Sequence, residues 1–273
     1  MEKLAVLKDI LSGMESVLVA YSGGVDSTLL VKVSKDVLQD HVVAVTAQSE
    51  TYPAREVKAA KEFAGIIGIK HIIINTKELE NEDFAANSAQ RCYYCKSELF
   101  TKLNELAREH GLNYVADGSN YDDTKDFRPG AKAACELGVR SPLKEAGFRK
   151  QEIRILSKEL NLPSWNKPSY PCLSSRFPYG SRITSQELIR VNQAEELLAT
   201  FGFSQLRLRV HGAVARIEVP QEEIPLLFGP GISEKVMSEL KRIGYAYITV
   251  DLQGYRMGSM NETLKTKVGM EFE

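Results

Sequence analysis

Short apolar runs alternate along the chain with stretches in which apolar residues recur every three or four positions. An unbroken apolar run of this length indicates a buried strand, and the longer period indicates an amphipathic helix. The expected strands lie at 17–21, 42–47, 71–75 and 113–117. One expected helix runs through Leu4 to Leu11, and another follows the first strand and ends at about residue 38. Further helices are expected at about 53–67, 95–110 and 147–160, and a polar loop at 119–131. Strands that alternate with helices predict an α/β fold built on a doubly wound parallel sheet.

A second, smaller α/β domain is predicted beyond a segment rich in turn-forming residues. Three prolines and a glycine within 168–180 argue against regular structure there. After this segment the apolar pattern predicts a helix at about 184–200 and strands near 205–210, 214–219 and 245–250. We therefore expect a first domain over 1–163, a functional linker over 164–183 and a second domain over 184–273.

The first strand runs directly into Ser22-Gly23-Gly24-Val25-Asp26-Ser27, which has the features of a phosphate-binding loop. The glycines let the backbone turn sharply and approach a ligand closely, and the helix that opens at Ser27 presents free N–H groups to an anion. The Walker A pattern is absent, and no Gly-x-Gly-x-x-Gly follows this strand. Because ligands of parallel sheets bind beyond the carboxyl ends of the strands, residues 46–50 and 117–120, including Gly118, are expected to meet this loop.

This six-residue motif resembles the PP-loop of the ATP pyrophosphatases, which include GMP and NAD synthetases and tRNA thiolases. The resemblance implies that ATP is bound with Mg²⁺ and is cut between its α and β phosphates. The residues expected to contact the nucleotide are Ser22, Gly23, Gly24, Asp26, Ser27 and Gly118.

Composition and charge narrow the class of protein. Of 273 residues, 43% are hydrophobic and 26% are charged, as in ordinary globular proteins. No apolar run approaches the roughly 20 residues of a membrane span, and residues 1–4 lack the layout of a secretion signal, so we expect a cytoplasmic protein without a membrane partner. A net charge of −1 disfavours a large nucleic-acid surface and favours a small-molecule substrate.

The cysteines of a cytoplasmic chain are best examined for metal binding or catalysis rather than for disulfides. Cys92 and Cys95 form a C-x-x-C pair just ahead of the 95–110 helix, and Cys172 lies in the linker. Three thiolates leave zinc short of a fourth ligand, whereas a 4Fe-4S cluster held by three cysteines keeps one iron open for sulfide. The pattern favours the cluster over zinc and over uncoordinated thiols, among which Cys172 beside Arg176 is a candidate nucleophile or sulfur donor. Cys135 is interpreted as a small buried hydrophobe.

Residues 206–210 alternate between apolar side chains and arginines, so a strand here places Arg207 and Arg209 on one face. Two guanidinium groups that point the same way suit a phosphate or a carboxylate, and a solvated outer face is the alternative. Arg176 and Arg182 in the linker favour the anion site.

Several further segments carry a closer resemblance. They are Trp165-Asn166-Lys167, Ser174-Ser175-Arg176-Phe177-Pro178-Tyr179-Gly180, Arg207-Leu208-Arg209 and Asp251-Leu252-Gln253-Gly254-Tyr255-Arg256. Together with the PP-loop they make the chain similar, from end to end, to the LarE family of ATP-dependent sulfur transferases. The resemblance implies that a pyridinium biscarboxylate mononucleotide is adenylylated on a carboxylate and then attacked by sulfur, with release of AMP, during synthesis of the nickel-pincer nucleotide cofactor. It also implies a homo-oligomer.

The resemblance assigns further site residues. Glu195, Arg207 and Arg209 match the family's substrate-phosphate site, and Arg176 matches the arginine of its Ser-Ser-Arg signature. In the sacrificial members, one cysteine before this signature gives up its sulfur, and that position falls here on Pro171.

The cysteine pattern departs from that of the sacrificial members, which also lack the pair that Cys92 and Cys95 form here. With Cys172, this pair resembles the cluster-dependent branch and implies sulfide or a sulfur carrier as donor. A tRNA thiolase, sacrificial transfer from Cys172, an ammonia-using synthetase and a noncatalytic nucleotide sensor are the alternative interpretations.

Overall fold

The structure is a computed structural model that describes residues 2–125, 129–256, 258 and 259. The chain forms two compact units. The first comprises Met1–Phe84 and Ala89–Tyr170, and the second comprises Ala85–Ser88 and Pro171–Glu273. The domain boundaries expected from the sequence stay predictions, and residues 260–273 of the expected second domain lie outside the described residues.

The first unit is built on a four-stranded parallel sheet with the strand order β3-β2-β1-β4. The strands are β1 (Val17–Ala20), β2 (Val42–Gln48), β3 (Lys70–Asn75) and β4 (Tyr114–Ala116). In register, Val17 lies opposite Val42 on one side and Tyr114 on the other. The chain therefore moves outward from β1 to β3 and returns to β4 on the opposite side of β1. This reversal of strand order opens the ligand-binding crevice of such folds beyond the carboxyl end of β1.

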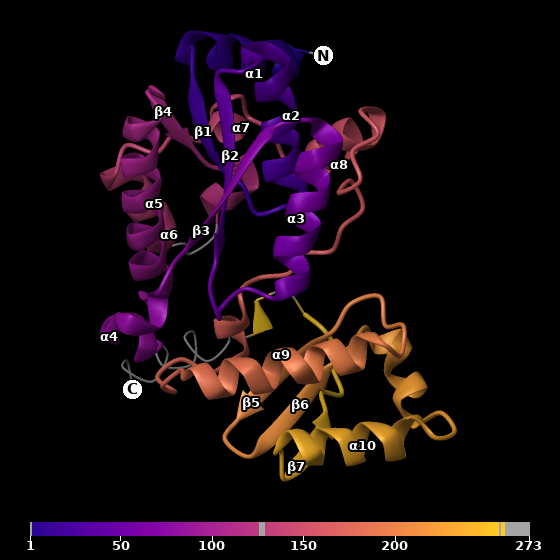
Figure 1. The fold of residues 1–273 in the computed structure, drawn as a ribbon. Coiled ribbons are helices and arrows are strands. Elements are labelled where there is room, and N and C mark those ends of the chain that lie inside the picture. The colour runs from indigo at the N-terminus through magenta and orange to yellow at the C-terminus, as the bar shows by residue number, and fades with distance from the viewer. Residues whose placement is uncertain (1, 126–128, 257, 260–273) are drawn as a thin grey trace, which may run out of the picture. The chain divides into compact units, whose positions relative to one another are not determined.

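Helices cover both faces of this sheet, as expected for a doubly wound fold (Figure 1). Val17 and Val19 of β1 pack into one apolar core, and Leu18 between them packs into another. The helices of the first core are α1 (Glu2–Met14), α2 (Val25–Leu38), α3 (Ala54–Ile67), α7 (Pro142–Glu145) and α8 (Lys150–Glu159). The helices of the second core are α5 (Arg91–Glu109) and α6 (Pro129–Glu136). Short helical segments elsewhere are η1 (Glu78–Glu80), α4 (Glu82–Ala85) and η2 (Tyr121–Lys125).

Two local predictions are wrong. Helix α5 begins at Arg91, so the C-x-x-C pair lies within the start of the helix and not ahead of it. Contacts from α6 hold this turn, since the Tyr93 hydroxyl donates to Glu136 at 2.7 Å. Cys135 is exposed and not buried, because α6 buries its neighbours Ala133 and Ala134 and so turns the next side chain outward. The start of α6 at Pro129 also shortens the expected 119–131 loop, of which 126–128 lie outside the described residues.

The second unit contains a three-stranded sheet with the order β5-β6-β7, which confirms a second, smaller α/β region. Strand β5 (Arg207–His211) is antiparallel to β6 (Val214–Glu218), and β6 is parallel to β7 (Tyr247–Val250). Two helices accompany the sheet: α9 (Ser185–Ala199), which lies beside β5, and α10 (Ile232–Ile243), which lies beside β7. The short helices are η3 (Leu173–Arg176) and η4 (Gln221–Phe228).

Among the residues that the structure describes, no helix is both long and apolar enough to cross a membrane.

Candidate functional site

The turn between β1 and α2 requires a glycine at position 23. Gly23 has a φ of +68°, and a Cβ added to it would lie 2.9 Å from the Cα of Ala60 on α3. Both the backbone conformation and the lack of space therefore exclude a side chain. Gly24 follows as the N-cap of α2 in an extended conformation. The tight turn brings this loop directly onto α3, and α2 begins immediately after it.

Hydroxyl groups hold the loop in shape. The Ser27 hydroxyl donates to the Gly24 carbonyl at 3.2 Å and accepts from the Ser22 backbone N–H at 3.2 Å. The Ser22 hydroxyl accepts from the Gly24 N–H at 3.3 Å and lies 3.1 Å from the Ser27 oxygen. The first N–H groups of a helix have no partner within the helix and favour an anion. The loop is thus held in a shape that suits a phosphate group.

The segment after β4 meets this loop, as the topology predicts. A Cβ on Gly118 would lie 2.9 Å from the backbone nitrogen of Ser27. The Asn120 amide donates to one Asp26 oxygen at 3.2 Å, and the Asp117 carboxylate accepts from the Ser119 hydroxyl at 2.7 Å. The structure therefore brings together Ser22, Gly23, Gly24, Asp26, Ser27 and Gly118.

Sequence reasoning missed two lysines at this site. The Lys150 ammonium, at the start of α8, forms an ion pair with the second Asp26 oxygen. The Lys167 ammonium donates to the Gly23 carbonyl at 3.2 Å and forms an ion pair with Glu56 at 2.9 Å. Each lysine is far in sequence from the residue it contacts, so no local pattern predicts either contact. Lys167 belongs to a segment that carries the family resemblance, but the pattern gave it no role.

The C-x-x-C pair also lies at the carboxyl edge of the parallel sheet, beside the loop that follows β2. Cys92 is exposed and Cys95 is half-buried, one turn apart at the start of α5. The Tyr52 hydroxyl, in the loop after β2, lies 4.0 Å from the Cys95 sulfur. Two thiols on one helix face, three residues apart, suit two ligands of one inorganic centre. Within the described part of the first unit, no three His, Cys, Asp or Glu side chains gather as a metal site.

In the second unit, a fully buried ion pair forms between Arg176 and Glu195. Arg176 Nε and Nη2 donate to the two oxygens of Glu195, each at 2.8 Å. Arg176 Nη1 donates to the carbonyl oxygens of Pro171 at 2.9 Å and Cys172 at 3.2 Å. Burial alone would raise the pKa of Glu195, but Arg176 and the Leu208 N–H hold that pKa below its usual value. The arginine of the Ser-Ser-Arg signature therefore fixes the backbone around Cys172.

Arg207 and Arg209 share one face of β5, and that face is buried, with exposed fractions of 1% and 5%. The solvated-face alternative is therefore wrong. Arg209 Nε donates to Glu218 at 3.0 Å, and the Arg207 guanidinium lies 5.2 Å from the centre of the Tyr255 ring. Burial and the nearby Arg176 lower the pKa of Arg207 to about 10.

Among the side chains that the structure describes, these buried groups carry more positive than negative charge. Three buried arginines, Arg176, Arg207 and Arg209, accompany two buried carboxylates, Glu195 and Glu218. Such a surplus suits an anionic ligand. Glu218 was missed by sequence reasoning because its place opposite Arg207 depends on the pairing of β5 with β6. Arg182, expected to support the site, is exposed and stands outside this buried cluster.

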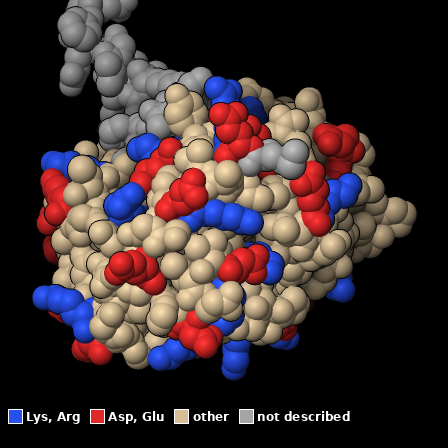
Figure 2. Space-filling view, turned by 90° about the horizontal axis from the view of Figure 1, so that it is seen from above, with Lys and Arg blue, Asp and Glu red and all other residues tan. Residues whose placement is uncertain are grey.

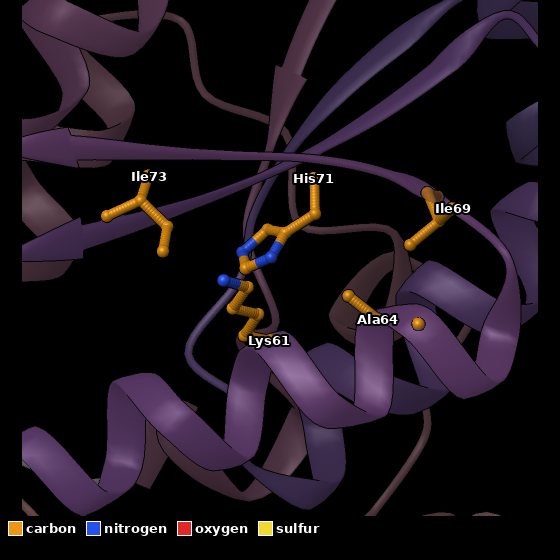
Figure 3. A pocket seen from close by; sticks show the side chains of 6 residues that line it. Lys61, Ala64, Ile69, His71 and Ile73 are labelled. Carbon is orange, nitrogen blue, oxygen red and sulfur yellow. The ribbon is translucent and has the colours of Figure 1, made fainter.

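A groove of about 470 Å³ lies elsewhere in the first unit, between the edge strand β3 and α3 (Figure 3). Its lining residues are Lys61, Ala64, Gly65, Ile69, His71 and Ile73, and none is a predicted site residue. The Thr46 hydroxyl donates to the Tyr21 carbonyl at 2.7 Å, so it accepts from His71 Nε2 at 2.8 Å. Burial lowers the pKa of His71. His71 therefore supports the strand that leads into the phosphate loop.

Charges on the face shown in Figure 2 are mixed. Lys and Arg side chains alternate there with Asp and Glu and do not form one broad basic surface. This distribution agrees with the net charge of −1.

Comparison with known proteins extends the similarity over both units. The family model of NAD synthase matches residues 4–120, which include the phosphate loop. An uncharacterized protein of Synechocystis sp. is 45% identical over 262 residues, which span 96% of this chain and 98% of that protein. The pyridinium-3,5-bisthiocarboxylic acid mononucleotide synthase of Lactiplantibacillus plantarum is 39% identical over 265 residues, which span 96% of this chain and 95% of that enzyme. The tRNA-specific 2-thiouridylase of Desulforamulus reducens is 26% identical over 193 residues, or 56% of this chain and 52% of that protein.

Proposed function

Because the chain belongs to the LarE family, that of the pyridinium-3,5-bisthiocarboxylic acid mononucleotide synthase, we propose that it is an ATP-dependent sulfur transferase of nickel-pincer nucleotide synthesis. The observation that carries this proposal is the 39% identity over 96% of the chain, which extends beyond the nucleotide-binding part. The preformed phosphate loop supports the use of ATP. The substrate proposed is a pyridinium-3,5-biscarboxylate mononucleotide.

In the first step, a carboxylate oxygen of the substrate attacks the α-phosphorus of ATP. The bond from this phosphorus to the bridging oxygen breaks, and pyrophosphate leaves with the electron pair. The N–H groups at the start of α2 bind the phosphates, and Lys150 adds a positive charge beside Asp26. Asp26 offers the carboxylate oxygens that Mg²⁺ prefers, and Mg²⁺ would neutralise charge on the phosphates.

In the second step, a sulfur nucleophile at the sulfide oxidation level attacks the activated carbonyl carbon. The bond from this carbon to the AMP oxygen breaks, AMP leaves with the electron pair, and a thiocarboxylate remains. No oxidant or reductant is needed, because sulfur keeps its oxidation level. The surplus of buried guanidinium charge around Arg207 and Arg209 suits the phosphate of the substrate.

We propose that Cys92, Cys95 and Cys172 hold a 4Fe-4S cluster. The helical pair of thiols at the start of α5 suits two of its ligands. When bound, the cluster supplies an open iron that carries sulfide. Arg176 would then position the Cys172 backbone. The alternative is that Cys172 itself gives up its sulfur, its Cβ–S bond breaking to leave dehydroalanine. The sulfur donor, sulfide or a sulfur carrier, and the homo-oligomer also stay predictions.

Turnover tests this function. Protein purified without oxygen is supplied with ATP, Mg²⁺, sulfide and the biscarboxylate mononucleotide, and thiocarboxylate and AMP are measured together. We expect equal amounts of the two products, and none without ATP. AMP formed without any thiocarboxylate would contradict a sulfur transferase.

The same assay on cysteine variants separates the two sulfur sources. If the three thiols hold a cluster, Cys92→Ser, Cys95→Ser and Cys172→Ser each lose bound iron and repeated turnover, while the exposed Cys135→Ser keeps both. Iron and sulfide content, turnovers per chain and the mass of the chain are the measurements. A single turnover, with loss of the mass of hydrogen sulfide from Cys172, would support sacrifice and contradict the cluster.

A further inference from the structure

We propose that Lys167, held by Glu56, is a positioning residue of the phosphate loop, which fixes the Gly23–Gly24 peptide so that the Gly24 N–H faces the phosphates. This inference rests on the proposed function, since it assigns part of the ATP site. It starts from the contact of the Lys167 ammonium with the Gly23 carbonyl at 3.2 Å.

The Lys167 ammonium is engaged by protein groups on two sides. It forms an ion pair with Glu56 at 2.9 Å, and the side chains are only 13% and 16% exposed. The ring of Phe63 lies below the same ammonium, with its centre 5.5 Å away. With its charge matched by Glu56, Lys167 is placed to brace the loop rather than to contact phosphate.

One face of α3 supports both the Lys167 ammonium and Gly23, the two partners of this hydrogen bond. Glu56, Ala60 and Phe63 are spaced as neighbours on a single helix face. Ala60 lies directly against Gly23, where a Cβ would approach to 2.9 Å, while Glu56 and Phe63 hold the ammonium. The α-carbon of Gly23 and its carbonyl oxygen are thus each fixed from the same helix.

Because of the geometry of the peptide bond, the contact of Lys167 with the Gly23 carbonyl also determines where the Gly24 N–H points. In a trans peptide the carbonyl oxygen and the following N–H point in opposite directions, and the structure has no cis peptide among its described residues. Fixing the Gly23 oxygen therefore aims the Gly24 N–H. A peptide between two glycines turns over easily, because neither residue has a Cβ to restrict it. The Gly24 N–H makes a long contact of 3.3 Å with the Ser22 hydroxyl, which a phosphate oxygen can replace.

The backbone of Lys167 is itself anchored. Arg154 on α8 donates to the Trp165 carbonyl at 2.9 Å and to the Lys167 carbonyl at 3.0 Å. A side chain positions a loop well only if its own main chain is held. Lys167 meets this condition through the two donors of one guanidinium.

The test compares Lys167→Met and Glu56→Gln with the wild type. Pyrophosphate release from ATP and the biscarboxylate mononucleotide gives kcat and the KM for ATP. We expect kcat to fall about 100-fold in Lys167→Met, the usual effect of losing one preorganised donor, with a much smaller change in KM. Glu56→Gln should change kcat in the same direction, and Lys167→Arg should restore part of it.

Spectra of protein labelled with ¹⁵N-glycine supply a readout apart from activity. A nonhydrolysable ATP analogue should shift the Gly24 amide signal strongly in the wild type and weakly in Lys167→Met, while the other glycine signals show that the variant is folded. The matched control is Lys3→Met. Lys3 also donates to a glycine carbonyl, that of Gly147, at 2.8 Å and to a glutamate, Glu152, at 2.7 Å, but it does not contact the loop. We expect wild-type kcat in this control.

Any of three results would overturn the inference alone. If Lys167→Met raises the KM for ATP with kcat unchanged, or if Glu56→Gln tightens ATP binding, the ammonium contacts the phosphates directly. A kcat in Lys167→Met equal to that of the wild type would also overturn it. A wild-type protein that shows neither the Gly24 shift nor pyrophosphate release would overturn the proposed function, and the inference with it.

Discussion

Gly23→Ala is expected to lower the rate of adenylylation by at least about 100-fold, the usual cost of misplacing a preorganised donor. The new Cβ would lie 2.9 Å from Ala60 on a backbone at a φ of +68°, so the turn must move away from α3. Because the contact is with the Cα of Ala60, a change of rotamer cannot relieve it. Pyrophosphate release measured at saturating ATP checks this prediction.

Gly13→Ala is the control for this variant. Gly13 lies in α1, and an added Cβ would meet nothing within 4 Å. The substitution should leave the rate unchanged and raise stability by up to about 1 kcal/mol, the difference in helix propensity between the two residues. A Gly23→Ala protein with the wild-type rate would show that the loop does not bind the reacting nucleotide.

Glu195→Ala should lower the free energy of unfolding of the second unit by about 3 to 5 kcal/mol. Both partners of the Arg176–Glu195 pair are at most 1% exposed, so the variant leaves a buried guanidinium without its carboxylate. The Leu208 N–H also loses its acceptor. The sole tryptophan, Trp165, belongs to the first unit, so hydrogen exchange of the β5 amides is the appropriate measurement.

Glu196→Ala serves as the control, since Glu196 is the next residue on α9 and is exposed. Among the described residues, its side chain is hydrogen-bonded only to Asn192, at 2.9 Å. Its effect should be within about 0.5 kcal/mol, as for most surface substitutions. Replacing Arg176 and Glu195 together by leucine should recover much of the loss, because no unpaired charge remains. A loss below about 1 kcal/mol in Glu195→Ala would mean that the pair is not buried in solution.

Local features of the fold and the site were predictable from the sequence. Strand β1 and the loop at Ser22 to Ser27 form one continuous segment, so apolar pattern, glycines and hydroxyls all point to the same turn. Arg207 and Arg209 were placed on one face of β5 by simple alternation. In each case, the residue pattern that supports the prediction lies within a single strand or a strand and the turn that follows it.

Contacts between distant segments were not predictable in this way. Lys150 and Lys167 reach Asp26 and Gly23 across 124 and 144 residues, and no local pattern encodes that distance. The burial of Arg207 depends on surrounding side chains, so alternation alone left a solvated face equally open. The exposure of Cys135 was missed because a helix as short as α6 shows too little periodicity to define its buried face.

In the proposed reaction, a substrate carboxylate is activated by transfer of AMP and then loses an oxygen to sulfur. The most direct measurement supplies the biscarboxylate mononucleotide with ¹⁸O in its carboxylates, together with ATP, Mg²⁺ and sulfide, and determines the isotope content of the AMP released. We predict one ¹⁸O in each AMP for every thiocarboxylate formed. Thiocarboxylate accompanied by unlabelled AMP, or by ADP in place of AMP, would contradict the account.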